Sequence, residues 1–125
     1  MYLLLLYLQF IFSLSPVVSA LPYAEIQMAF EENSAESVMS FCENPILLIL
    51  DDQEGVYNHA QASMILGAFF KRYPNGAFEY QFQGSEENSD IFSAATYILD
   101  SERFQVQFSF SNKKPNKIQS IRFEK

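Results

Sequence analysis

The sequence is poor in the residues that carry most protein chemistry, with one cysteine, one histidine and no tryptophan in 125 residues. Cys42 is alone, so no intramolecular disulfide can form, and we expect it to be a small buried hydrophobe. Nucleophilic catalysis needs a histidine paired with a nucleophile and an orienting group, and metal sites need several ligands. His59 and Cys42 alone supply neither. We therefore predict no metal and no cofactor, and a surface role for His59.

Positive charge is missing from the first half of the chain. No Lys or Arg precedes Lys71, and the formal net charge is -7. An acidic domain is a poor binder of phosphate backbones. Nucleic acid is therefore disfavoured as a partner.

Charge is also absent from the N-terminal segment. Residues 1–12 are nearly all apolar, Pro16 interrupts the run, and small or modest residues end it at Val18-Ser19-Ala20. This pattern is typical of a signal peptide over residues 1–20, cleaved near Ala20. The alternative is a segment retained as a membrane anchor. We predict export to the periplasm or medium, without stable membrane insertion after cleavage, and a single domain over residues 21–125.

Aromatic residues are abundant, at 16% with 13 Phe, and they follow helix and strand periodicities. A first helix is predicted from Tyr23 to Phe30. A second begins after an Asn33 cap and buries Val38, Phe41 and Cys42. A third begins after an Asn58 cap, and its apolar face runs from Ala62 to Tyr73. A strand covered on both faces is predicted over Ile46–Leu50, and Val56-Tyr57 returns as a second strand.

Four sheet strands are predicted to follow. Phe78, Tyr80 and Phe82 alternate with polar residues, residues 91–99 are apolar at nearly every position, and apolar and polar residues alternate again from Phe104 to Ser111. In the last strand, from Ile118 to Glu124, Ile118 is out of phase with Ile121, which predicts a bulge. The polar links from Gly84 to Asp90 and from Ser111 to Asn116 are predicted loops.

The chain resembles a family of exported bacterial proteins of unknown function with a nuclear transport factor 2-like, or cystatin-like, fold. The resemblance rests on Ile26-x-x-Ala29-Phe30, Gly55-Val56-Tyr57-Asn58-x-x-Gln61-Ala62, Ile65-Leu66-x-x-Phe69-Phe70 and the segment from Ile118 to Lys125. It implies an α+β cone of order ααββαββββ, in which three helices pack on a curved antiparallel sheet that can enclose a cavity. It implies no catalytic residue.

Candidate ligand-binding residues are the aromatic side chains expected to line such a cavity. These are Phe30, Tyr57, Phe69, Tyr73, Tyr80 and Tyr97. We predict an exported, non-enzymatic domain that binds a small apolar ligand or a protein partner. One alternative is an isomerase- or dehydratase-type enzyme with Asp100 or Asp51 as general base. Another is an envelope protein-interaction module.

One face of the predicted sheet carries uncharged polar residues rather than the usual mixture of charges. They are Gln81, Gln83, Gln105, Gln107 and Ser109, with Ser111 beyond them. An uncharged amide face can pack against a second sheet with its hydrogen bonds satisfied. In the fold family that the chain resembles, such faces often form dimers, so the resemblance implies a homodimer through this face, with a plain solvated face as the alternative.

Overall fold

A computed structural model describes residues 21–51, 53–84, 91–113 and 116–125. The predicted signal peptide over residues 1–20 lies outside the described residues, as do most of the link from Gly84 to Asp90 and part of the link from Ser111 to Asn116.

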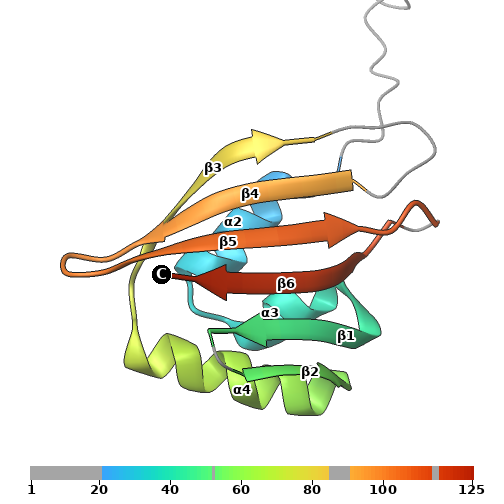
Figure 1. Cartoon of the computed structure of the whole chain (residues 1–125), viewed down its shortest axis with the longest axis horizontal. Coiled ribbons are helices and arrows are strands. Elements are labelled where there is room, and N and C mark those ends of the chain that lie inside the picture. Colours follow the sequence, from blue (N-terminus) through green and yellow to red (C-terminus); the bar gives the residue numbers. More distant parts are fainter. Residues whose placement is uncertain (1–20, 52, 85–90, 114–115) are drawn as a thin grey trace, which may run out of the picture.

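The described elements follow the predicted order. They are α2 (Tyr23–Glu31), α3 (Ala35–Ser40), β1 (Cys42–Leu50), β2 (Gln53–Tyr57), α4 (His59–Arg72), β3 (Ala77–Gln83), β4 (Ile91–Ile98), β5 (Arg103–Phe110) and β6 (Ile118–Glu124). The order ααββαββββ is therefore confirmed (Figure 1).

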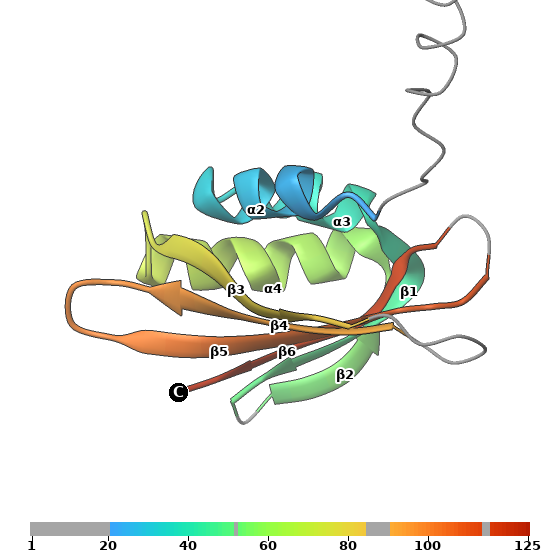
Figure 2. The same ribbon diagram turned by 90° about the horizontal axis from the view of Figure 1, so that it is seen from above.

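The strands form a single six-stranded sheet in the order β2-β1-β6-β5-β4-β3. Neighbouring strands are antiparallel except β1 and β6, which run parallel. The three helices lie on one face of this curved sheet (Figure 2). We call the helix-covered face the inner face and the opposite one the outer face.

Two bulges change which side chains face the core. The predicted bulge in β6 is confirmed, because the pairing with β5 shifts next to Ile118 and thereby brings Ile118 inside. A second bulge, in β3, was not predicted. It shifts the register between Tyr80 and Phe82, so Phe82 pairs with Ala94 and lies on the outer face. The alternation of Phe78, Tyr80 and Phe82 with polar residues predicts that all three face inward, and for Phe82 this prediction is wrong.

The helix starts are set by short polar side chains. Asn58 caps α4 as predicted, accepting a 2.8 Å hydrogen bond from the Gln61 amide. The cap of α3 is Ser34, which accepts from the Ser37 amide, and not Asn33. Asn33 instead adopts a left-handed conformation with φ 56°, which Asn tolerates better than most residues. Its side chain is thereby free to bond elsewhere.

The second helix is also shorter than predicted. It ends at Ser40, and Cys42 is the first residue of β1, paired with Ile118 of β6. A hydrogen bond from the Ile118 amide to the Phe41 carbonyl fixes the first residue of β1 beside β6. The buried residues of α3 are Val38 and Met39, whereas Phe41 is half-buried. Strand β1 is fully buried only at alternate positions, so its outer face is partly open.

The core is a cluster of aromatic rings between the helices and the inner face. Phe30 stacks on Phe78 at 4.5 Å and meets Phe70 and Phe123 at 6.0 Å. All four side chains are buried. Each buried Phe contributes on the order of 2 kcal/mol of transfer free energy, so this cluster supplies a large share of the free energy that holds the small domain together.

Candidate functional site

The six aromatic candidates do not form one cavity. Phe30 and Tyr97 are completely buried in the core. The Tyr97 hydroxyl donates to the Tyr73 carbonyl at 2.7 Å, and it accepts from the Asn33 side chain at 2.9 Å and the Gly76 amide at 3.1 Å. These protein groups occupy the hydroxyl, so it is not directed at a ligand.

Tyr80 lies near the start of α2. Its hydroxyl donates to the Tyr23 carbonyl at 2.7 Å, and the Tyr23 hydroxyl is 3.0 Å from that of buried Ser93. Burial, followed by the nearby Tyr23 and Glu25, raises the pKa of Tyr80 above its ordinary value. Tyr57 ends β2 and is half-buried. It lies on one edge strand of the sheet, whereas Tyr80 lies on β3 at the opposite edge.

Phe69 and Tyr73 are brought together at the C-terminal half of α4. Their rings are 5.2 Å apart, and both contact Phe104 of β5. They border a surface depression of about 440 Å³ between α4 and the turn after β1. Its lining also includes Leu50, Asp51, Gln53, Met64, Ile65, Ala68 and Arg72. Of the six candidates, these two face a space that could receive a ligand.

The two candidate bases lie at the rims of depressions. Asp51 borders the depression beside Phe69, and Asp100 borders a neighbouring one of about 740 Å³ beside Tyr73. Both aspartates are exposed. Asp51 has φ 46° in the turn after β1, and its amide donates to the Phe123 carbonyl. A carboxylate that ends a strand in water needs no catalytic explanation.

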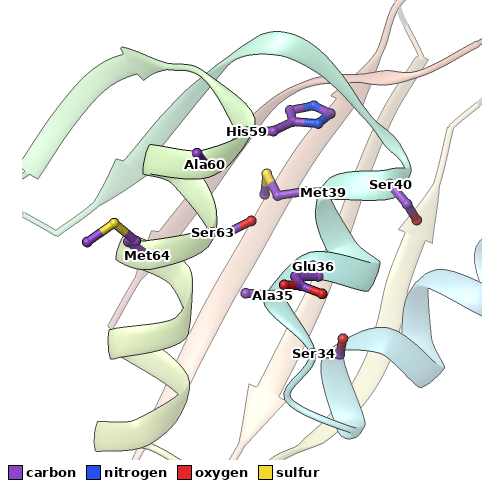
Figure 3. Close-up of a pocket in the computed structure, with 9 residues that line it drawn as sticks. All are labelled: Ser34, Ala35, Glu36, Met39, Ser40, His59, Ala60, Ser63 and Met64. Atoms are coloured by element: carbon purple, nitrogen blue, oxygen red, sulfur yellow. The ribbon is translucent and has the colours of Figure 1, made fainter.

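A further groove of about 840 Å³ runs between α3 and α4 (Figure 3). Met39 and Ala35 lie on one side, Ala60, Ser63 and Met64 on the other, and the His59 ring closes one end.

His59 is half-buried at this end of the groove. Its Nε2 lies 3.1 Å from the Cys42 carbonyl and 2.9 Å from that of Glu43. Because carbonyl oxygens only accept hydrogen bonds, Nε2 carries a proton here and ties α4 to β1. The histidine therefore has a structural role at the surface.

Cys42 is buried, and its Sγ donates to the Val38 carbonyl at 3.3 Å. Burial raises the pKa of the thiol from 9.0 to about 12, with a small opposing effect of Lys117. A thiol with such a pKa is a poor nucleophile at neutral pH. Among the described residues, no group of three or more His, Cys, Asp or Glu side chains is placed to hold a metal ion.

The outer face of the sheet carries the other predicted surface. Residues paired across strands share a face, so the register defines rows across it. The row through the middle of the face is Phe82, Ala94, Gln107, Arg122, Ile49 and Glu54. The next row is Phe92, Ser109, Ser120, Leu47 and Val56. Gln105 pairs with Glu124 one row further.

The predicted polar surface is therefore altered at its β3 end. Gln105, Gln107 and Ser109 do share the outer face, but the β3 bulge pairs Gln83 with the inward residue Ser93. Phe82 takes the outer position, 54% exposed, and its ring lies 6.2 Å from that of Phe92, which is 45% exposed. Alternation alone could not reveal this pair, because the bulge reverses the phase of β3.

No helix among the described residues is long and apolar enough to cross a membrane.

The helices on one face of a curved six-stranded sheet define an α+β protein of the nuclear transport factor 2-like, or cystatin-like, class. The chain belongs to the family described as "Domain of unknown function (DUF4783)", whose model matches residues 23–124.

Solved structures give the same fold. A DUF4783 family protein from Bacteroides uniformis is 20% identical over 85% of this chain and 97% of its own, with a TM-score of 0.75. A cystatin-like domain of unknown function from Nostoc punctiforme is 9% identical over 81% and 70%, with a TM-score of 0.61. A SnoaL-like protein of unknown function from Burkholderia thailandensis is 8% identical over 87% and 98%, with a TM-score of 0.65. No curated protein matches the chain.

Proposed function

We propose that this protein is an exported, non-enzymatic binding module that recognises a partner protein through the outer face of its sheet. The observation that carries the proposal is the exposed ring pair of Phe82 and Phe92. It borders a band of Gln and Ser side chains that no described element covers. Exposed apolar side chains next to neutral polar ones are typical of protein interfaces. Export is supported by the apolar pattern of residues 1–20.

Site-specific photo-cross-linking in the producing cells tests this function. Benzoylphenylalanine at position 92 samples the outer face. The same residue at position 64 is a matched control, because Met64 is 76% exposed on α4, away from the outer face. We expect a protein adduct from position 92 that F82E weakens. The absence of any adduct from position 92, with the protein folded and exported, would disprove the proposal.

A second candidate function is the binding of a small apolar ligand beside Phe69 and Tyr73. The apolar lining of the depression, which includes Leu50, Ile65 and Ala68, supports it. Titration with an anilinonaphthalene sulfonate probe tests this site, with A68E as the blocking variant and A60E, elsewhere on α4, as its control. Probe binding that A68E abolishes and A60E retains would favour this function.

The isomerase or dehydratase alternative has less support. A general base must lie within hydrogen-bond reach of the substrate in a pocket that excludes water. Asp51 and Asp100 are both exposed, so neither lies in such a pocket.

A further inference from the structure

We infer that the groove between α3 and α4 is a second docking surface, and that it takes a basic amphipathic helix presented by a partner protein. The groove lies on the helix-covered side of the molecule, away from the outer face of the sheet (Figures 2 and 3). The inference therefore goes beyond the proposed function and does not depend on it.

The shape of the groove suits a third helix. Ala35 and Met39 of α3 face Ala60, Ser63 and Met64 of α4 across it (Figure 3). Ala60 and Met64 are exposed, whereas Met39 is buried. Small side chains allow a further backbone to approach closely, and methionine adapts its shape to what it meets. The groove can therefore receive the apolar stripe of a helix.

The charge around the groove is negative. Glu36 lines it, and Glu32 and Glu43 lie close to its ends in the sequence. No Lys or Arg precedes Lys71, so α2, α3 and most of α4 carry no cation. Among the described residues, Glu36 forms no ion pair. A partner with positive charges beside its apolar stripe would complement this surface, in both affinity and rate of association.

The chain itself shows that a cation can bind at one end of the groove. The Lys117 ammonium group donates to the Ser40 carbonyl at 3.2 Å. Ser40 is the last residue of α3 and lines the groove. The final carbonyls of a helix lack helical partners and attract basic side chains. Lysine or arginine side chains of a partner would be attracted to the same side of the molecule.

The walls of the groove favour a helical partner over other kinds. An extended peptide binds by adding a strand to a sheet edge, whereas an amphipathic helix binds in an apolar groove. This groove is lined by α3, α4 and the residues at their starts, and it contains no strand. Anionic lipid surfaces and phosphate backbones would be repelled by the same carboxylates.

A labelled peptide tests the inference on the purified protein. The probe is a fluorescein-labelled amphipathic peptide of lysine, leucine and alanine, about 18 residues long so that it can form a helix. One control peptide has glutamate in place of every lysine. Another keeps the lysines but has two central prolines, which break the helix. Fluorescence anisotropy gives the Kd of each peptide.

Two alanines of α4 provide matched variants. Ala60 and Ala68 are both exposed on α4, but only Ala60 lines the groove. The eight residues between them span about 12 Å of helix, which exceeds the Debye length of about 8 Å at 0.15 M salt. A charge at position 68 should therefore act little on a peptide in the groove. Urea denaturation checks that all variants remain folded.

We expect the lysine peptide to bind more tightly than both controls. Its Kd should rise about tenfold or more in A60K, a loss of about 1.4 kcal/mol or more, and should fall in A60E. A68K should change the Kd by less than about threefold, because its charge is screened. F82E, on the outer face, should leave the Kd unchanged.

Three results would each overturn the inference: no binding of the lysine peptide, equal binding of the proline peptide, or equal losses in A60K and A68K. The last would indicate a general attraction to an acidic protein. None of them bears on the proposed function, which depends on the adduct from position 92. In cells, an adduct from position 64 should be weakened by A60K and not by F82E.

Discussion

The side-chain amide of Asn33 donates a 2.9 Å hydrogen bond to the hydroxyl of Tyr97, 64 positions away in the sequence. The same amide donates to the Phe30 carbonyl at 2.9 Å, and the Asn33 side-chain oxygen accepts from the Asn75 amide at 2.8 Å. Asn33 thus joins the turn between α2 and α3 to the turn after α4 and to β4. Its left-handed backbone is what aims the side chain at these partners.

Replacing Asn33 by glycine should therefore destabilise the protein, although glycine accepts the backbone angle. Asn33→Gly removes three hydrogen bonds, and we expect a loss of about 1–3 kcal/mol in the free energy of unfolding. Asn75→Gly is the matched control, since Asn75 is also left-handed, with φ 63°, and only its backbone is bonded to Asn33. Urea denaturation measures both. An equal loss in the two variants would refute a specific role of the Asn33 side chain.

Removing the Tyr97 hydroxyl tests the same junction from its other side. In Tyr97→Phe, the Tyr73 carbonyl, the Gly76 amide and the Asn33 side chain all lose a partner, with Tyr97 itself fully buried. We expect a loss of about 2–3 kcal/mol, because buried unsatisfied groups carry their desolvation cost. Tyr80→Phe loses one bond in a half-buried setting and should cost less. The urea concentrations at the unfolding midpoint compare the two variants, provided that the dependence of the unfolding free energy on urea concentration is unchanged. A larger loss of stability in Tyr80→Phe than in Tyr97→Phe would contradict this prediction.

Two glycines should respond to alanine in opposite directions. A Cβ on Gly76 would lie 2.5 Å from Cζ of the Tyr97 ring, which the surrounding bonds hold in place. Gly76→Ala should therefore destabilise the fold by at least about 1 kcal/mol. A Cβ on Gly67, inside α4, would meet the Ala35 Cβ at 4.0 Å, an ordinary contact. Gly67→Ala should stabilise by about 0.5–1 kcal/mol, since alanine favours the helix. Thermal unfolding that moved both variants in the same direction would disprove this contrast.

The sequence predicted the elements well because their signals are local. The Asn58 cap, the apolar periodicity of α4 and the phase break at Ile118 each lie within a few residues, and the structure confirms all three. The predicted helix cap at Asn33 was wrong by one residue, because the side chain of the adjacent Ser34 can also accept a hydrogen bond from a helix amide. The choice between them depends on Tyr97, which is remote in sequence.

The candidate site was less predictable than the fold. Whether an aromatic residue lines a space or fills one depends on its neighbours in three dimensions, so Phe30 and Phe69 could not be separated by periodicity. The outer position of Phe82 depends on a bulge in β3, for which the alternating sequence holds no signal. Gln105, Gln107 and Ser109 were placed on the correct face because β5 alternates without interruption, whereas Ser111, just beyond the strand, is buried.

The buried thiol of Cys42 predicts a loss of stability in alkali. Its pKa is about 12 in the folded protein and 9.0 ordinarily. Between these values the unfolded chain releases the proton while the folded protein retains it, so rising pH favours unfolding. The contribution is fully present below pH 9, and the loss is about 1.4 kcal/mol per pH unit above it. The raised pKa of Tyr80 acts in the same direction.

Cys42→Ala isolates the thiol from the other groups that titrate in alkali. The variant loses packing at every pH, but its stability should fall less steeply above pH 9 than that of the wild type. The difference in unfolding free energy between the two proteins should therefore shrink from pH 8 to pH 10 by about 1 kcal/mol. Guanidinium denaturation at each pH gives this difference. A difference that stayed constant would mean that the folded thiol titrates at its ordinary pKa, and the native protein should then also react with a thiol reagent at pH 9.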